Sequence, residues 1–409
     1  MTVQKRIAEL DGLRGCAILL VTIWHSVMLI DPSQGVINDL IWRLSIFGQS
    51  GVDLFFVLSG FLIVGILYDH KESDTYFSTF YIRRTLRILP PYLILISIFY
   101  VLTRLRGTNY YFGSQIPVWA LLTFIQNWLF VSTQGTEPAA IAGTWSLAIE
   151  EQFYLVVPAL VWFAPRRYLL PTLLAIGLAS ASARACYFWT HPGNLYAPYV
   201  MTPLRLDGLA IGGAIAVAYR NEAIRARIFA HIKAIRWVCL LLLLIAPFYA
   251  WSLRSSVAHQ VLYYVGHFYL ALLYGLILIL ATQPGDGRTK SILRSRILGF
   301  FGLISYSLYL FHTPAKGFVF HLFLGTAEQL QTTSDVVLMA VSAAVAIAFC
   351  LALYRVVERP AQLFGKTFSY NSNAEGSSTL IVQTYLKQDE TKSNRLRRTS
   401  KSCATNEIP

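Results

Sequence analysis

Arg14 and His25 lie in the first apolar stretch of the chain, eleven positions apart. Over that interval an α-helix turns through about 1100°, three turns plus roughly 20°, and rises about 16 Å. Both side chains therefore fall on one helical face. Arg14 is suited to hold the anionic head of a long ligand. His25, deeper in the helix, is suited to act as a general base on an acceptor hydroxyl or to be acylated itself. The alternative is that His25 only hydrogen-bonds a neighbouring helix.

Three arginines, Arg83, Arg84 and Arg87, lie at the start of the third apolar stretch. A guanidinium group binds phosphate through two parallel hydrogen bonds, so this cluster would fit a diphosphate head group. The competing interpretations are a topology anchor and a site for anionic lipid head groups.

Carboxylates also occur inside apolar segments, where ionisable groups are costly and therefore functional candidates. Asp53 needs a partner, and the Ser59-Gly60 pair that follows permits close helix packing. Glu150 and Glu151 point about 100° apart on a helix, so they cannot share one role. We expect Glu150 to be the acid of the site and Glu151 to pair with an arginine such as Arg205.

Two further charged features have structural interpretations. Arg205 and Asp207 are expected to form an ion pair at a helix start. His312 is expected to be structural rather than catalytic. The five cysteines have no metal-site spacing and suggest no disulfide framework. We find no nucleotide-binding glycine loop, metal-ligand cluster or serine-nucleophile elbow.

The composition indicates which elements must position these residues. Hydrophobic residues make up 55% of the 409 positions and charged residues 13%, against about 25% charged in soluble domains. The mean hydropathy is +0.52. Lys and Arg lie between the apolar blocks, so the net charge of +13 indicates positive-inside topology rather than nucleic-acid binding.

Eleven apolar segments can be counted, each tested against the length of about 20 residues that a membrane helix needs. They are roughly 13–30, 45–67, 86–103, 117–131, 149–164, 168–189, 203–219, 236–252, 260–282, 297–320 and 335–357. Eleven crossings would put Arg166 and Arg167 outside, which opposes the positive-inside rule. The sequence therefore predicts an all-α polytopic membrane helical bundle of about ten transmembrane helices. The segment near 117–131 would be re-entrant or interfacial, and both termini cytoplasmic.

The first apolar run could be mistaken for a signal peptide, but it contains His25 and no small-residue cleavage site follows it. We expect a retained span. From about Thr367 the chain becomes rich in Ser, Thr, Asn and Lys. The predicted organisation is a membrane domain over residues 1–366 and a disordered basic cytoplasmic tail over 367–409.

Seven motifs together resemble the acyltransferase 3 family of membrane acyltransferases, in the family's order and over roughly residues 8–366. They are LDGLRG at 10–15 with His25, VDLFFVLSGFLI at 52–63, RRTLRILPPY at 83–92, WSLAIEEQFYL at 145–155, RLDGLAIGG at 205–213, YSLYLFH at 306–312 and VERP at 357–360.

The resemblance implies ten spans, a cytoplasmic acyl-CoA donor and transfer to surface polysaccharide, lipopolysaccharide or lipochitin oligosaccharide. The family's arginine–histidine pair corresponds to Arg14 and His25. Its arginine-rich segment corresponds to Arg83, Arg84 and Arg87, and its acidic motif to Glu150 and Glu151. His312 lacks the neighbouring tryptophan often found in the family. No periplasmic esterase-like domain is recognised here, so we expect transfer to be completed within the membrane domain.

The resulting hypothesis is an O-acyltransferase, most simply an O-acetyltransferase, of the bacterial inner membrane. It would take acetyl-CoA as co-substrate, use no metal, and act on exopolysaccharide, O-antigen or lipochitin oligosaccharide. His25, Arg14 and Glu150 would be catalytic, and Arg83, Arg84 and Arg87 would bind the donor. A transporter or flippase of lipid-linked sugars is the first rival, although transporters often contain repeated halves and none is found here. A non-catalytic membrane sensor with the same fold is the second.

Overall fold

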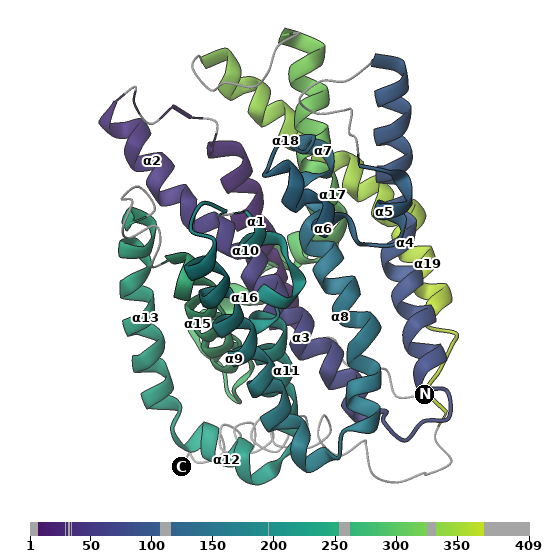
Figure 1. Ribbon diagram of the computed structural model, residues 1–409, viewed down its shortest axis with the longest axis vertical. Helices are drawn as coiled ribbons and strands as arrows, with labels where there is room; N and C mark the ends of the chain where they lie inside the picture. Colours follow the sequence, from purple (N-terminus) through teal and green to yellow (C-terminus); the bar gives the residue numbers. More distant parts are fainter. Residues whose placement is uncertain are drawn as a thin grey trace, which may run out of the picture.

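The computed structural model describes residues 7–28, 30–31, 33, 35–106, 116–194, 196–252, 262–324 and 333–371. Every regular element within these ranges is helical (Figure 1). Eight stretches of the described chain are long and apolar enough to cross a membrane, or up to nine if a pair of bent helices counts as one span. The prediction of an all-α polytopic membrane protein is confirmed.

The membrane-length stretches combine long helices with short helical extensions. In chain order they are α1 (Ala8–Val27); α2 (Val36–Ile46), the 3-10 turn Phe47–Ser50 and α3 (Gly51–Asp69); α4 (Tyr76–Arg106); α7 (Ala139–Ala142) with α8 (Thr144–Phe163); α9 (Arg166–Thr190); the π-helical turn Leu262–Gly266 with α15 (His267–Thr282); α17 (Arg296–Leu324); and α18 (Thr333–Leu353), the π-helical turn Tyr354–Glu358 and α19 (Arg359–Gly365). The bent pair is α12 (Glu222–Ala230) and α13 (Ile232–Ser252), which meet at 66°.

The predicted segment 203–219 forms α11 (Asp207–Arg220), which has 14 residues. That is below the length of about 20 residues expected for a crossing helix. Most of α11 is buried, and it packs against α3, α9 and α15. The count of about ten spans therefore stays a prediction, because α11 is a central helix of less than membrane length.

The segment near 117–131 consists of two short helices, α5 (Val118–Leu122) and α6 (Gln126–Thr133). Gln126 and Asn127 are buried, and their amide groups donate to the carbonyl oxygens of Thr144 and Val200 at 3.1 and 3.0 Å. Polar groups and non-helical backbone at membrane depth are tolerated where they are buried in protein and hydrogen-bonded to it. Neither helix is long enough to cross, which agrees with the prediction of a non-crossing segment.

Glycines let the central helices approach closely. A Cβ atom on Gly60 of α3 would lie 1.9 Å from the carbonyl oxygen of Leu209 on α11, and one on Gly12 of α1 would lie 2.0 Å from that of Leu293. No larger residue fits either position without moving the backbone. The expected close packing at Ser59-Gly60 is confirmed.

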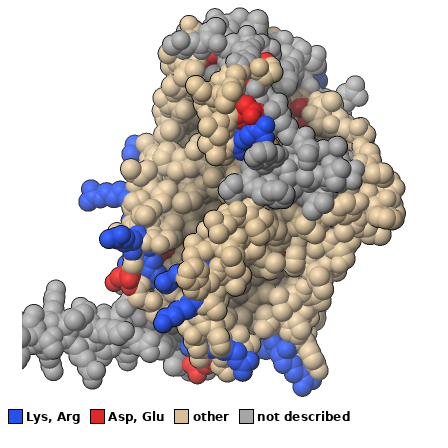
Figure 2. Space-filling view, turned by 90° about the vertical axis from the view of Figure 1, so that its left-hand side faces the viewer, with Lys and Arg blue, Asp and Glu red and all other residues tan. Residues whose placement is uncertain are grey.

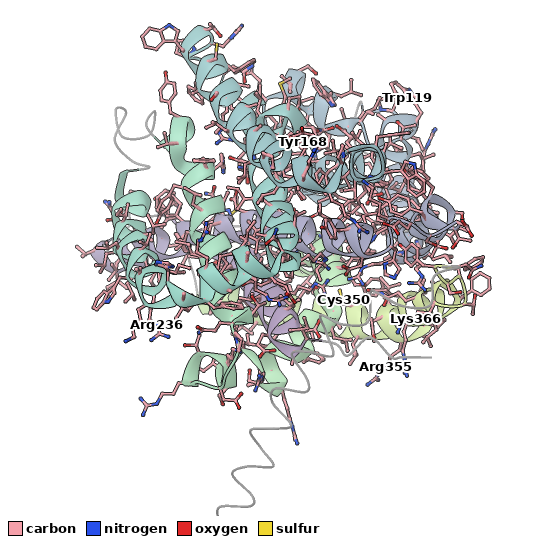
Figure 3. The ribbon with its side chains drawn as sticks, turned by 90° about the horizontal axis from the view of Figure 1, so that it is seen from below. Trp119, Tyr168, Arg236, Cys350, Arg355 and Lys366 are labelled. Carbon is pink, nitrogen blue, oxygen red and sulfur yellow. The ribbon has the colours of Figure 1, made fainter. Side chains whose placement is uncertain are left out.

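Short helices connect some of the longer elements. They are α10 (Ala197–Val200), the 3-10 turn Thr202–Leu204 and α16 (Arg288–Leu293). In the face shown in Figure 2, Lys and Arg side chains gather mainly in the lower part, below a broad uncharged band. Seen from below in Figure 3, Arg236 and Arg355 lie at the edge of the bundle, whereas Cys350 lies closer to its centre. This distribution suits a protein held in a membrane.

The predicted tail is described only at its start. Residues 367–371 lie against the beginning of α4, where the carbonyl oxygen of Ser369 accepts hydrogen bonds from Thr75 and Thr79 at 3.0 and 3.1 Å. The remainder of the predicted tail, 372–409, lies outside the described residues.

Candidate active site

Two neighbouring cavities contain most of the predicted site residues. The first, here called the arginine cavity, has a volume of about 100 Å³ and is lined by α1, α3, α4, α8 and α17. The second, here called the histidine cavity, has a volume of about 210 Å³. Tyr309 of α17 lines both cavities. Its hydroxyl is 2.5 Å from the Ser146 hydroxyl and donates to the carbonyl oxygen of Gly143 at 3.0 Å.

The arginine cavity brings together Arg14 from α1 and Arg84 and Arg87 from α4. Arg84 and Arg87 are three positions apart and share a helical face. Arg84 lies over the rings of Phe80 and Tyr154, and neither it nor Arg87 has an ion-pair partner among the described residues. Glu150 contributes the one carboxylate of the lining. An excess of cations around a cavity favours an anionic ligand.

Glu150 of α8 lies in the same cavity, opposite α3. Its carboxylate accepts hydrogen bonds from Ser59 at 3.2 Å and from Tyr154 at 2.9 Å. These two contacts fix the position of the carboxylate in the cavity. The neighbouring Glu151 does not line the cavity, and its buried Oε1 has no hydrogen-bond partner among the described residues. The structure therefore separates the two acids as the helical geometry predicted.

Arg83 is not brought to the cavity. Its Nε donates to the carbonyl oxygen of Phe368 at 2.8 Å, and its guanidinium lies 5.2 Å from the ring centre of Tyr370. Adjacent positions on a helix point about 100° apart, so Arg83 and Arg84 cannot face the same space. Helical periodicity turns Arg83 toward the segment after α19, so a shared donor site for all three arginines stays a prediction.

His25 lines the histidine cavity together with His312 of α17. Their ring centres are 4.9 Å apart, with an angle of 64° between the planes. Nδ1 of His25 contacts the carbonyl oxygen of Val21 at 2.8 Å, and Nδ1 of His312 contacts those of Leu308 and Tyr309, each at 2.9 Å. A carbonyl oxygen can only accept, so Nδ1 carries the proton in both rings. Each neutral ring then presents its Nε2 lone pair.

Lys316 and Glu137 complete the polar lining of the histidine cavity. Lys316 donates to the carbonyl oxygen of His25 at 2.7 Å, which ties the end of α1 to α17. Glu137 accepts hydrogen bonds from Thr133 and from Tyr196, the latter at 2.9 Å. Burial and the Glu137 carboxylate both raise the pKa of the Tyr196 hydroxyl, which therefore remains a donor.

The deeply buried ion pairs differ from those expected. Arg205 pairs with Asp53 at 3.1 Å, and His267 contacts the same carboxylate at 3.3 Å. Asp207 pairs with Arg184 at 2.7 Å. The predicted pairing of Arg205 with Asp207 or Glu151 was wrong, because helix packing brings carboxylates from other segments closer. The expectation that Asp53 needs a charged partner is confirmed.

Sequence reasoning missed Tyr309 and Lys316 and gave His312 only a structural role. The three lie at spacings of three and four positions, which place them on one helical face. That pattern was the available signal. Within the described ranges, no group of three or more His, Cys, Asp or Glu side chains could hold a metal ion.

Comparison with known proteins assigns the chain to a family. The sequence model of the acyltransferase 3 family, described as an acyltransferase domain, matches residues 7–355. This chain belongs to that family. The match covers α1 to α18 and thus both cavities of this acyltransferase-family chain.

Among curated relatives, the peptidoglycan O-acetyltransferase OatA of Listeria monocytogenes is 28% identical over 335 residues, which cover 76% of this chain and 49% of the relative. The O-acetyltransferase OatA of Staphylococcus aureus is 28% identical over 392 residues, which cover 91% of this chain and 60% of the relative. The chain thus spans about half to three-fifths of the length of these relatives. No solved structure matches it.

Proposed function

We propose that this chain is a membrane O-acyltransferase that moves an acyl group, most simply acetyl, from acyl-CoA to a carbohydrate hydroxyl. The observation that carries the proposal is the pairing of an arginine-lined with a histidine-lined cavity on either side of Tyr309. The names of the two relatives support acetyl as the group and a carbohydrate as the acceptor.

The arginine cavity is suited to the phosphates of the donor. Arg14, Arg84 and Arg87 outnumber the single carboxylate of the lining. Guanidinium groups bind phosphate oxygens through paired, charge-assisted hydrogen bonds. Aromatic side chains such as Phe55 and Tyr306 provide an apolar surface for the uncharged arm. These features fit acetyl-CoA as the co-substrate.

His25 is the proposed reactive residue. Its Nδ1 is held by the Val21 carbonyl, so its Nε2 can accept a proton from a hydroxyl or attack a thioester carbonyl. The two routes, direct base catalysis and an acyl-His25 intermediate, lead to the same ester. Arg14 lies on the same helix and would align the donor so that its thioester reaches His25.

Glu150 is proposed to orient the site or to relay protons. Its carboxylate is fixed by Ser59 and Tyr154 and lies in the cavity that holds Arg84 and Arg87. A carboxylate in that position would set the guanidinium groups against the donor phosphates.

The acceptor class follows the relatives and the family: peptidoglycan, exopolysaccharide, O-antigen or lipochitin oligosaccharide. We further propose that residues 1–366 form the acyltransferase domain in a bacterial inner membrane. Both termini would be cytoplasmic, with 367–409 as a basic tail. The donor would then enter from the cytoplasm and the acceptor from the outer side or the bilayer.

The proposal is tested by following radiolabelled acetyl from acetyl-CoA into glycan in membranes that contain the wild-type chain or His25→Ala. We expect labelled glycan with the wild type and a loss of at least about 100-fold with His25→Ala, the scale of general acid–base catalysis. His231→Gln is the matched control. This exposed histidine also has Nδ1 against a main-chain carbonyl, that of Arg227, but lines neither cavity.

Transfer that persists in His25→Ala would contradict the role of His25. Sugar translocation by the wild type without consumption of acetyl-CoA would instead favour a transporter of lipid-linked sugars. Expression and thermal unfolding of each variant are measured in parallel, so that loss of activity is separated from loss of fold.

A further inference from the structure

His312 has a second reactive nitrogen that the proposed function does not use. Its Nδ1 proton is shared by two main-chain carbonyls of its own helix, those of Leu308 and Tyr309. Its Nε2 is buried and has no hydrogen-bond partner among the described residues. A buried acceptor without a donor is costly, on the order of 1–3 kcal/mol. Such an atom is expected to meet a donor supplied by a ligand.

The position of this nitrogen is informative because the His312 ring lies 4.9 Å from the His25 ring, centre to centre. Both rings line the histidine cavity, and hydrogen bonding leaves Nε2 of both as lone-pair acceptors. One imidazole can act as nucleophile while its neighbour acts as base. Helix packing alone does not explain two imidazole rings at this distance. Apolar side chains would fill the same space without the cost of removing polar nitrogens from water.

We propose that the histidine cavity is the acceptor site and that His312 is the base that deprotonates the carbohydrate hydroxyl as it attacks an acyl group on His25. This inference rests on the proposed acyltransferase function. It deepens that function by assigning the second half-reaction, and the hydroxyl that enters it, to one cavity.

The reaction balances in two steps. His25 Nε2 first attacks the thioester carbonyl carbon; the carbon–sulfur bond breaks and CoA leaves as its thiolate. The acyl-imidazolium keeps its Nδ1 proton against the Val21 carbonyl. The carbohydrate oxygen then attacks the acyl carbon and its proton passes to His312 Nε2. The bond to His25 breaks, and its electron pair returns to His25 Nε2. The proton on His312 leaves through the cavity and is balanced by protonation of the thiolate.

The lining of the histidine cavity suits an uncharged, hydroxyl-rich ligand better than the donor. Its two charged side chains are already engaged: Lys316 with the carbonyl oxygen of His25, and Glu137 with Thr133 and Tyr196. Its lining contains no arginine among the residues that the structure describes, whereas the lining of the arginine cavity contains three. The two substrates would therefore be sorted by charge, with Tyr309 at the boundary.

The two half-reactions can be separated with His312→Asn, because the asparagine amide can donate at the Nδ1 position but has no counterpart of Nε2. Purified wild type and variants in detergent are mixed with radiolabelled acetyl-CoA, and both CoA release and label on the chain are measured after acid quenching. The same variants in membranes of the producing organism, which contain the native acceptor, report transfer to glycan.

We expect His312→Asn to release about one equivalent of CoA per chain and to retain the label at His25. Transfer to glycan should fall at least about 100-fold. In His312→Ala, added imidazole should restore part of the transfer by occupying the vacated base position. A purely structural role for His312 would give neither trapped label nor rescue. His25→Ala should show neither the burst nor the label, and His231→Gln should resemble the wild type.

Transfer by His312→Asn within about threefold of wild type, a difference too small for a lost base, would overturn the inference. So would a variant that folds but releases no CoA, because His312 would then be needed before the second half-reaction. Neither result would contradict the proposed function, provided that the wild type transfers acetyl to glycan. If the wild type releases no CoA and labels no glycan, both the proposed function and this inference are contradicted.

Discussion

Two groups of arginines within the helical bundle differ in what faces their guanidinium groups. Arg184 and Arg205 have side chains exposed by 0% and 1% and are paired with Asp207 and Asp53. Arg84 and Arg87 of α4 are half-buried, face the arginine cavity and have no ion-pair partner among the described residues. Both groups carry the charge that makes an arginine costly within a membrane.

The paired arginines connect helices. Arg184 of α9 also donates to the carbonyl oxygen of Leu204 at 2.6 Å, which fixes α9 against the start of α11. Arg205 lies 5.5 Å from the ring centre of Phe56 and 5.6 Å from those of Trp145 and Tyr199. Their charges are compensated within the protein. Arg84 and Arg87 line a cavity without such a partner among the described residues, whereas Arg14 lines the same cavity and also pairs with Asp11 at 3.2 Å.

The largest expected effect is on stability, from breaking a paired arginine. Arg184→Ala leaves the buried Asp207 carboxylate without its cation and should destabilise the protein by about 3–5 kcal/mol. Thermal unfolding in detergent and the yield of monodisperse protein measure it. Arg84→Ala is the comparison and should unfold close to wild type. Equal stability of Arg184→Ala and wild type would contradict a structural role for this pair.

The next effect concerns donor binding by the cavity arginines. Arg84→Ala and Arg87→Ala should each raise the KM for acetyl-CoA roughly tenfold to 100-fold, since charge-assisted hydrogen bonds contribute about 1.5–3 kcal/mol. Initial-rate kinetics at varied acetyl-CoA provide the measurement.

Arg83→Ala is the matched control for both variants, because Arg83 contacts Phe368 and Tyr370 rather than the cavity. Its KM should change less than about threefold, below the effect of one lost charge-assisted bond. An equal rise in KM for Arg83→Ala would indicate a general attraction for anions and not a built donor site.

The smallest effect is expected at the boundary between the cavities. Tyr309→Phe removes the hydroxyl contacts with Ser146 and Gly143 but keeps the ring. The loss of stability should be about 0.5–1.5 kcal/mol per hydrogen bond removed, as for ordinary hydrogen bonds. A thermal shift assay measures the change. A variant as stable as wild type would show that these contacts add nothing measurable to the stability of the protein.

The individual helices could largely be predicted from the sequence, because the length and hydropathy of a membrane helix are local properties. The same holds for residues that share a helix. Arg14 and His25 both lie on α1, but Arg14 lines the arginine cavity and His25 the histidine cavity. The exception, α11, is apolar but only 14 residues long. Its first and last residues, Asp207 and Arg220, form ion pairs with Arg184 of α9 and Asp69 of α3.

Partners from different helices could not be predicted. Local spacing suggested Arg205 with Asp207, but these residues belong to two ion pairs with Asp53 and Arg184. The His25–His312 contact joins α1 and α17. The two histidines are nearly 290 positions apart in the sequence. α1 and α17 approach closely at Gly15, where a Cβ atom would lie 2.2 Å from the carbonyl oxygen of Leu298, and no local pattern encodes which helix will be approached.

The sequence by itself determined an all-helical membrane protein, the residues able to bind anions or exchange protons, and the helical face on which each lies. These follow from hydropathy, side-chain chemistry and the 3.6-residue period of the helix. Only the tertiary structure decided which charges are compensated and which face a cavity, and that two histidines meet. The physical reason is that a side chain's contribution depends on the groups within hydrogen-bonding distance, and in this bundle those groups come from distant parts of the chain.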